Sequence, residues 1–243
     1  MLPALLLAAA LAILWRVIRG GGSRRRRGPT DEREARRAQY RRWATRALLA
    51  FLLPSVAGLA LLGRLDALTI VPPEFGGLAA FIGPLRLSDA SLFGTGVAGG
   101  VLGALAGTLW SGRRRGKPGV RGPMLGEVGA LLPQHRGELP HAALLAIGAG
   151  VTEEPFFRLL LPLLITLVTG SVVAGFVLAA LLFGAAHRYQ GWKGVAATTV
   201  MGLLFTALYL ASGRLWVAMV FHAFLDLMGL VVRPALTGAW RRA

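Results

Sequence analysis

The chain contains no cysteine, and its acidic residues are few. Without cysteine there is no disulfide framework, no thiol nucleophile and no thiolate ligand for a metal. The 243 residues include 11 Asp and Glu against 27 Lys and Arg, and charged residues make up only 16% of the chain. An average soluble domain contains about 25% charged residues. A soluble globular protein is therefore excluded, because polar side chains are too few to cover its surface.

Hydrophobic residues make up 55% of the sequence and are gathered into long runs that basic segments separate. A backbone that crosses lipid must satisfy its own hydrogen bonds, so such runs should be helices. The sequence lacks a visible internal repeat, which argues against a transporter built from repeats. We predict an all-α integral membrane protein with about seven transmembrane helices, at Leu2–Leu14, Ala44–Gly63, Ala90–Trp110, His141–Val168, Val172–His187, Val195–Ala211 and Leu215–Val232.

The basic segments predict the topology of a single membrane domain. Residues 16–46 contain twelve arginines and three acids, and a second basic segment covers 113–121. Basic loops remain on the cytoplasmic side, so both segments should be cytoplasmic loops that contact anionic lipids. A nucleic acid partner is not expected, because no interleaved aromatic residues accompany the charges. Residues 1–140 then supply the amino-terminal spans and residues 141–233 a core, and the composition suggests a bacterial inner membrane.

Six of the ionisable residues within or at the ends of the carboxyl-terminal apolar runs are candidates for a site: Glu153, Glu154, Arg158, His187, His222 and Asp226. A charge at the centre of a membrane helix costs about 2.5–3.5 kcal/mol, so such residues are usually functional. Glu154 and Arg158 are four residues apart and should pair on one helix face. Glu153 is rotated by about 100° from Glu154, which leaves its carboxylate available in a polar cavity that opens to the cytoplasm.

Two chemistries fit this set of residues. Glu153 and a histidine could hold a water molecule and deprotonate it by general-base catalysis. Alternatively, His187 and His222 with Asp226 or Glu153 could bind zinc and leave one position open for water. Both routes activate water, and hydrolysis of an amide bond is the natural reaction. The sequence does not decide between a zinc cofactor and no cofactor.

Other intramembrane protease motifs are missing. The sequence contains no HExxH, which excludes the usual zinc protease helix. It contains no GxSxG and no serine in a span near the histidines, which argues against a serine nucleophile. It contains no GxGD, and Asp226 is the only aspartate inside a span, which argues against a pair of catalytic aspartates.

Three short motifs resemble those of the CPBP family of intramembrane proteases, which includes the CAAX prenyl endopeptidases and the bacterial Abi-type proteins. EEPFFR at 153–158 resembles EExxxR, FGAAH at 183–187 resembles FxxxH, and HAFLD at 222–226 resembles HxxxN or HxxxD. The resemblance implies about eight transmembrane helices around a cytoplasm-facing cavity. It implies that Glu153 and His187 activate water, that His222 and the residue at 226 face the oxyanion, and that Glu154, Arg158 and Phe183 support them.

The sequence departs from the family pattern at two informative positions. Pro155 directly follows the acidic pair, where a helix interior normally avoids proline, and we expect it to open the helix. Asp226 stands where the prenyl endopeptidases have asparagine, and an ionised aspartate cannot donate to an oxyanion. We predict an intramembrane endopeptidase that acts on a peptide or a membrane-protein tail. The alternatives are a membrane scaffold or regulatory protein of the same fold and, third, a small proton-coupled transporter.

Overall fold

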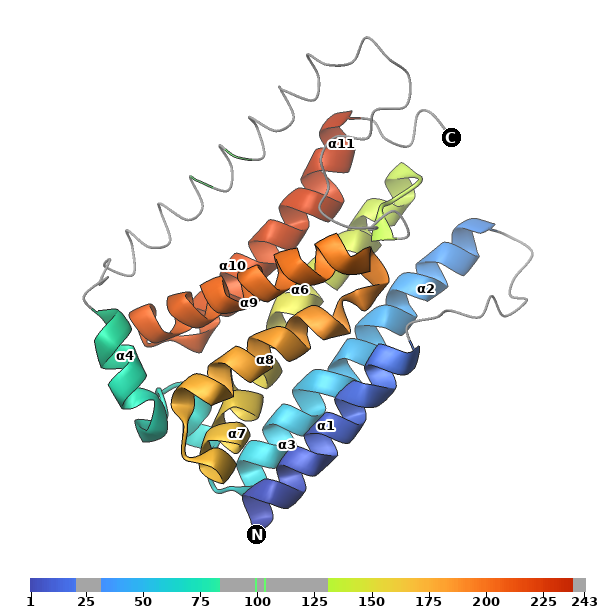
Figure 1. The fold of residues 1–243 in the computed structure, drawn as a ribbon. Coiled ribbons are helices and arrows are strands. Elements are labelled where there is room, and N and C mark those ends of the chain that lie inside the picture. Colours follow the sequence, from blue (N-terminus) through green and yellow to red (C-terminus); the bar gives the residue numbers. More distant parts are fainter. Residues whose placement is uncertain (21–31, 84–98, 100–102, 104–130, 238–243) are drawn as a thin grey trace.

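The structure is a computed structural model that describes residues 1–20, 32–83 and 131–237, together with Gly99 and Gly103 (Figure 1). The predicted span Ala90–Trp110, apart from these two glycines, and the basic segment 113–121 lie outside the described residues.

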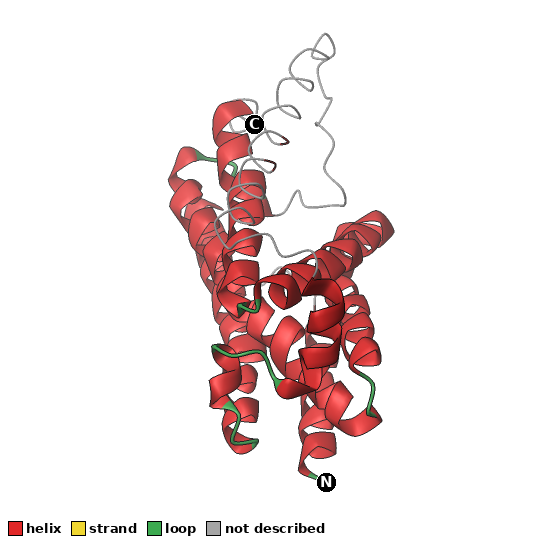
Figure 2. Ribbon diagram, turned by 90° about the vertical axis from the view of Figure 1, so that its left-hand side faces the viewer, coloured by secondary structure: helices red, strands yellow, loops and turns green. Residues whose placement is uncertain are grey.

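All regular elements in the described part are helical, as predicted (Figure 2). They are α1 (Leu2–Gly20), α2 (Glu32–Ala47), η1 (Leu48–Leu52), α3 (Leu53–Leu61), η2 (Leu65–Leu68), η3 (Pro73–Phe75), α4 (Gly76–Ile82), η6 (Arg136–Glu138), α6 (Leu139–Glu154), η7 (Pro155–Leu160), α7 (Leu161–Thr169), α8 (Val172–Ala186), η8 (Arg188–Gln190), α9 (Gly191–Ser212), α10 (Leu215–Leu227), η9 (Met228–Val232) and α11 (Arg233–Thr237).

Four helices of the described part are long and apolar enough to cross a bilayer: Leu2–Gly20, Glu34–Leu61, Arg188–Ser212 and Leu215–Leu236. A helix needs about 20 mostly apolar residues to span the hydrocarbon core. The shorter apolar helix Val172–Ala186 lies among them. The integral membrane class is thus confirmed, whereas the count of seven to eight spans and the cytoplasmic cavity stay predictions.

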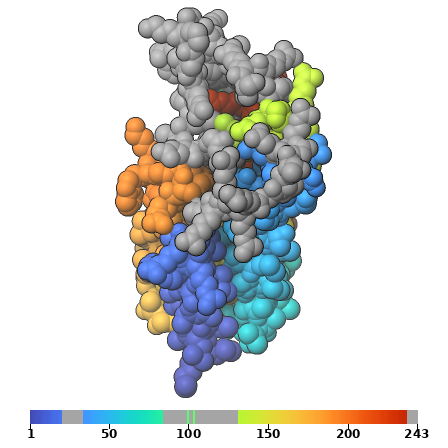
Figure 3. Space-filling model, turned by 90° about the vertical axis from the view of Figure 1, so that its right-hand side faces the viewer, coloured from blue at the N-terminus to red at the C-terminus, as the bar shows by residue number. Residues whose placement is uncertain are grey.

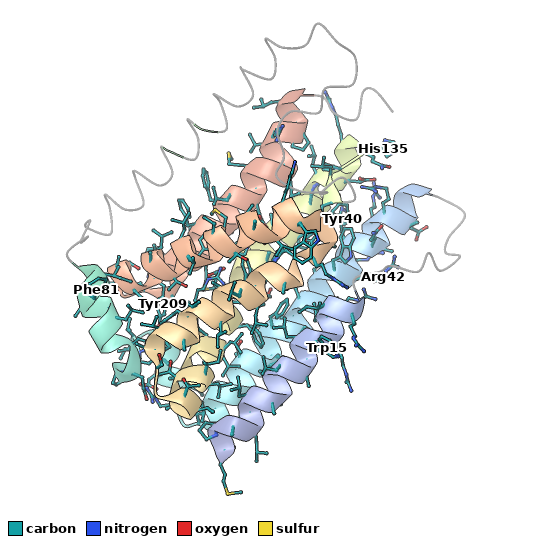
Figure 4. The ribbon with its side chains drawn as sticks, viewed as in Figure 1. Trp15, Tyr40, Arg42, Phe81, His135 and Tyr209 are labelled. Atoms are coloured by element: carbon teal, nitrogen blue, oxygen red, sulfur yellow. The ribbon has the colours of Figure 1, made fainter. Side chains whose placement is uncertain are left out.

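The basic segment 16–46 differs from the predicted loop, because much of it is helical. Helix α2 begins at Glu32 and continues through η1 into α3. Its exposed face carries arginines, whereas the buried Tyr40 donates a hydrogen bond to the Leu131 carbonyl oxygen at 2.8 Å. Arginine is a good helix former, so a basic composition alone does not exclude a helix. Tyr40 and His135 lie at the same end of the bundle (Figure 4).

A partly buried ion pair joins α2 to the segment that precedes α6. Nε of Arg36 lies 3.0 Å from both carboxylate oxygens of Glu138, whose side chain is buried. Nη2 of Arg36 also donates to the Leu132 carbonyl oxygen at 2.7 Å. The carboxylate of Glu138 accepts a further bond from the backbone N–H of Gln134 at 2.9 Å. These bonds fix the start of the helix that carries the acidic pair.

A connecting segment with two short 3-10 turns, η2 and η3, follows α3. Arg64 and Glu74 form an ion pair with a shortest N–O distance of 2.8 Å across this loop. The short helix α4 follows, and Leu78 and Ile82 pack against the main hydrophobic core. Figure 1 shows α4 at one end of the bundle, beside α9 and α10.

The run from α6 to α7 is continuous, and the helix widens at Pro155 instead of breaking. Proline has no N–H and normally interrupts an α-helix. Here residues 155–160 form a π-helical turn, in which the wider ring accommodates the missing hydrogen bond. A second π-helical turn, η1, packs against it, and Phe51 lies 5.3 Å from Phe156 and 5.2 Å from Phe157, measured between ring centroids. Helix α7 follows, and every residue from Leu161 to Thr166 is buried.

Helices α6 and α10 approach each other most closely at Gly150. A Cβ placed there would lie 2.4 Å from the Met219 carbonyl oxygen and 3.0 Å from the Ala223 backbone nitrogen. Glycine therefore lets the two backbones meet, as small residues do in membrane helix pairs. The contact lies one helical turn from both the acidic pair and His222.

We expect Gly150→Ala to destabilise the protein by roughly 1–3 kcal/mol, because the clash is with backbone atoms that cannot move aside. The melting temperature in detergent measures this change. Gly148→Ala is the matched control, since nothing lies within 4 Å of a Cβ at that position. Equal melting temperatures for the two variants would show that the close contact does not stabilise the bundle.

Candidate active site

The Glu154 side chain links three parts of the bundle. It is fully buried at the end of α6, and its Oε2 lies 3.0 Å from Nε of Arg158 in η7. Its Oε1 lies 2.6 Å from Nδ1 of His222 in α10. A carboxylate can only accept, so the imidazole Nδ1–H donates this bond. The predicted Glu154–Arg158 pair is present, and the bond to His222 is an addition that the sequence did not indicate.

The Arg158 guanidinium is held by charge and by aromatic rings. It is 1% exposed and lies over the Phe183 ring at 4.3 Å and the Phe205 ring at 5.2 Å. Cations over aromatic faces are stabilised by the ring quadrupole, more strongly when water is excluded. Phe183, for which the motif predicts a supporting role, thus contacts the guanidinium, whereas Phe205 in α9 belongs to none of the three motifs. The sequence alone does not identify Phe205 as a site residue, because it is one apolar residue among many in an apolar span.

The imidazole of His222 lies between two carboxylates. Nδ1 faces Glu154, and Nε2 lies 3.7 Å from Oδ2 of Asp226 on the next turn of the helix. The ring stacks on Phe205 with a centroid distance of 5.0 Å and an interplanar angle of 18°. The hydrogen bond to Glu154 and the stacking ring fix the plane of the imidazole, so that Nε2 faces the Asp226 carboxylate.

His187 ends α8 and has its ring orientation fixed by the backbone. Its Nδ1 lies 2.8 Å from the Phe183 carbonyl oxygen. A carbonyl oxygen can only accept, so Nδ1 carries the proton, and in the neutral ring Nε2 carries the lone pair. The Phe183 ring lies 4.6 Å from the His187 ring and 6.0 Å from the His222 ring. Phe183 is therefore a spacer between the two histidines.

In Glu153, the other acid of the pair, one carboxylate oxygen lacks a hydrogen-bond partner in the described part of the chain. Its Oε2 is buried and accepts no hydrogen bond from any described residue. Its carboxyl lies within electrostatic range of His187, His222 and Asp226 as well as Glu154. The structure thus brings together the four residues that the sequence singled out for catalysis, from α6, α8 and α10. The two glutamates of the acidic pair differ in one respect. Glu154 pairs with Arg158 and His222, whereas Oε2 of Glu153 has no such partner among the described residues.

The predicted zinc ligands are His187 and His222 with Asp226 or Glu153. No group of three His, Asp or Glu side chains in the described ranges is placed to hold a metal ion. The two imidazole Nδ1 atoms are engaged by Phe183 and Glu154, and Nε2 of His222 lies beside Asp226. A histidine that binds a metal usually donates one ring N–H to a carboxylate or carbonyl oxygen, so Nε2 of each ring is the atom that would coordinate an ion. The zinc alternative stays a prediction.

An apolar groove of about 320 Å³ lies between α6 and α10. Val151, Met219 and Ala223 are among its lining residues, and none of the catalytic candidates lines it. It is therefore distinct from the predicted polar cavity.

Comparison with known proteins agrees with the motifs. No curated protein and no solved structure matches the chain significantly. Residues 135–228 match the family model described as type II CAAX prenyl endopeptidase Rce1-like. The match includes all three motifs and overlaps the predicted core at 141–233. Residues 135–228 are thus similar to the Rce1-like model, in agreement with the resemblance of the three motifs to the CAAX prenyl endopeptidases.

Proposed function

We propose that this chain is an intramembrane endopeptidase in which Glu153 and His187 activate the attacking water. The observation that carries the proposal is the difference between the two glutamates. Glu154 is bound by Arg158 and His222, whereas the buried Oε2 atom of the half-buried Glu153 has no hydrogen-bond partner among the described residues. A buried carboxylate without a partner is costly, and such groups gather where chemistry needs them.

In the proposed reaction a water molecule lies between the Glu153 carboxylate and Nε2 of His187. Glu153 takes one proton, and the water oxygen attacks the peptide carbonyl carbon while the C=O electron pair moves to the oxygen. The proton on Glu153 then passes to the amide nitrogen as the C–N bond breaks. The products are a new carboxyl terminus and a free amine, so no external reactant other than water is consumed.

Glu154 and Arg158 have a positioning role in this proposal. The Glu154 carboxylate holds Nδ1 of His222, so that Nε2 faces the site. A doubly protonated imidazole with Nδ1–H bound to Glu154 can donate its Nε2–H to the developing oxyanion. Arg158 neutralises Glu154 and is itself enclosed by Phe183 and Phe205. The pair therefore fixes the geometry without contact with the substrate.

We place the site on the cytoplasmic side of the membrane. Arg188 directly follows His187, and Lys193 lies in the first turns of α9. Nη2 of Arg188 donates to the Ile18 carbonyl oxygen at 3.2 Å, near the exposed Arg16 and Arg19 of α1. In Figure 3 the orange segment around residue 190 lies against the upper part of α1. Basic residues at helix ends favour the cytoplasmic side and anionic lipids. The substrate, a peptide or a membrane-protein tail, would enter from there.

A scaffold or regulatory protein of the same fold is the second candidate. The buried Glu154–Arg158 pair favours it, because an ion pair can be retained for the packing of helices without any reaction. This reading predicts a stable protein that cleaves no peptide. Small proton-coupled transport, the third alternative, predicts proton-dependent uptake by vesicles that contain the protein.

The test is peptide cleavage by the purified protein in nanodiscs of mixed anionic and neutral lipid, with a farnesylated CAAX-type peptide and unmodified peptides as substrates. We expect cleavage detectable by mass spectrometry that persists after treatment with EDTA. Cleavage lost with EDTA and restored by zinc would favour the metal alternative. A folded protein that cleaves no peptide in a broad library would favour the scaffold.

A further inference from the structure

Tyr189 lies beside the site but belongs to none of the three motifs. The 3-10 turn η8, Arg188–Gln190, begins directly after His187, which ends helix α8. The Tyr189 ring lies 5.8 Å from the His187 ring, with an interplanar angle of 35°. The ring is 47% exposed, so it lines the open edge of the site rather than the packed core.

The hydroxyl group of Tyr189 has its proton available. Nε2 of Gln190 donates to the phenolic oxygen at 3.1 Å. A phenol that accepts one hydrogen bond still has an O–H to donate. The charges of Glu153 and Asp226 both act on this phenol, which places it within electrostatic range of the acids in α6 and α10. The O–H therefore belongs to the same group of side chains as the proposed base.

The third motif, HAFLD at 222–226, supplies few hydrogen-bond donors for the oxyanion. Its last residue is Asp226, whose side chain is 39% exposed and which stands where the prenyl endopeptidases that the motif resembles have asparagine. An ionised carboxylate only accepts hydrogen bonds, so it repels the negative oxygen that asparagine would stabilise. Among the described groups at the site, Nε2–H of His222 is then the donor that faces this oxygen.

We propose that Tyr189 supplies the missing hydrogen bond by donating its phenolic O–H to the carbonyl oxygen of the substrate. This inference rests on the proposed protease function and deepens it. The proton of Tyr189 stays on the phenol throughout, so the balance of the hydrolysis is unchanged. The bond strengthens as negative charge develops on the oxygen, and it therefore acts on the transition state more than on substrate binding.

Tyr189→Phe removes only the hydroxyl and tests the proposal. We expect kcat to fall by about 10²–10³-fold, the usual effect of the loss of one oxyanion donor, with little change in KM. Tyr209→Phe is the matched control. The Tyr209 hydroxyl has no hydrogen-bond partner among the described residues, and Figure 4 places it near α4, away from Tyr40 and the end of the bundle where His135 lies.

A second substitution separates a donor from a structural role. In the Tyr189→Phe background, Asp226→Asn introduces an amide donor, and we expect it to restore kcat at least tenfold. An unchanged kcat in Tyr189→Phe, a change confined to KM, or no restoration by Asp226→Asn would each overturn the role of Tyr189 while the protease function stands. A wild-type protein without cleavage would instead contradict the proposed function itself.

Discussion

Replacement of Glu153 by glutamine should abolish peptide cleavage and leave the fold intact. Glutamine has the same size but cannot take a proton from water, and the loss of a general base lowers rates by about 10²–10⁴-fold. The fold should tolerate the change because Oε2 of Glu153 accepts no hydrogen bond from a described residue. Initial rates of cleavage in nanodiscs, divided by the folded fraction, measure the effect.

The melting temperature of the same variant is the control for this prediction. We expect it to equal or exceed that of the wild-type protein, since a neutral amide replaces a buried acid that lacks a partner. A Glu153→Gln protein that cleaves at the wild-type rate would exclude Glu153 as the base. A loss of activity together with unfolding would make Glu153 a structural residue.

Replacement of Glu154 by alanine should cause a large loss of stability, whereas Glu153→Gln should leave the stability unchanged or higher. The change leaves the fully buried Arg158 without its carboxylate and His222 without its acceptor at Nδ1. Removal of one partner of a buried ion pair typically costs about 3–5 kcal/mol. The free energy of unfolding in mixed micelles, from denaturation with SDS, measures the loss.

The combined variant Glu154→Ala with Arg158→Met tests the cause of that loss. Methionine removes the uncompensated charge and retains an apolar side chain between Phe183 and Phe205, so we expect it to recover much of the stability. Activity should stay low, because His222 has lost the group that orients it. If Glu154→Ala is as stable as the wild-type protein, the pair does not hold the helices together.

The sequence predicts the helical membrane class and the Glu154–Arg158 pair, for clear physical reasons. Long apolar runs have few alternatives to helices in lipid, and charges within them are rare enough to be noticed. The Glu154–Arg158 pair follows from a spacing of four residues on one helix. Such local periodicities are present in the chain itself, and they need no knowledge of how the helices pack.

Contacts that depend on how the helices pack could not be predicted from the sequence. The Glu154–His222 bond joins residues 68 positions apart, and spacing along the chain does not show which face of α10 meets α6. Gly150 sets that contact, but many glycines in the chain look alike in the sequence. The predicted loop at 16–46 was wrong in part, because the high charge of α2 concealed a helix that an ion pair with Glu138 holds in place.

The most direct test of the central claim is cleavage in water enriched in ¹⁸O, with wild-type protein and Glu153→Gln compared at equal folded concentrations. The account predicts that the wild-type protein places ¹⁸O in the new terminal carboxylate of the peptide, while the variant forms no product above background. If Glu153→Gln forms the labelled product at the wild-type rate, another group activates the water and the assignment of Glu153 is contradicted.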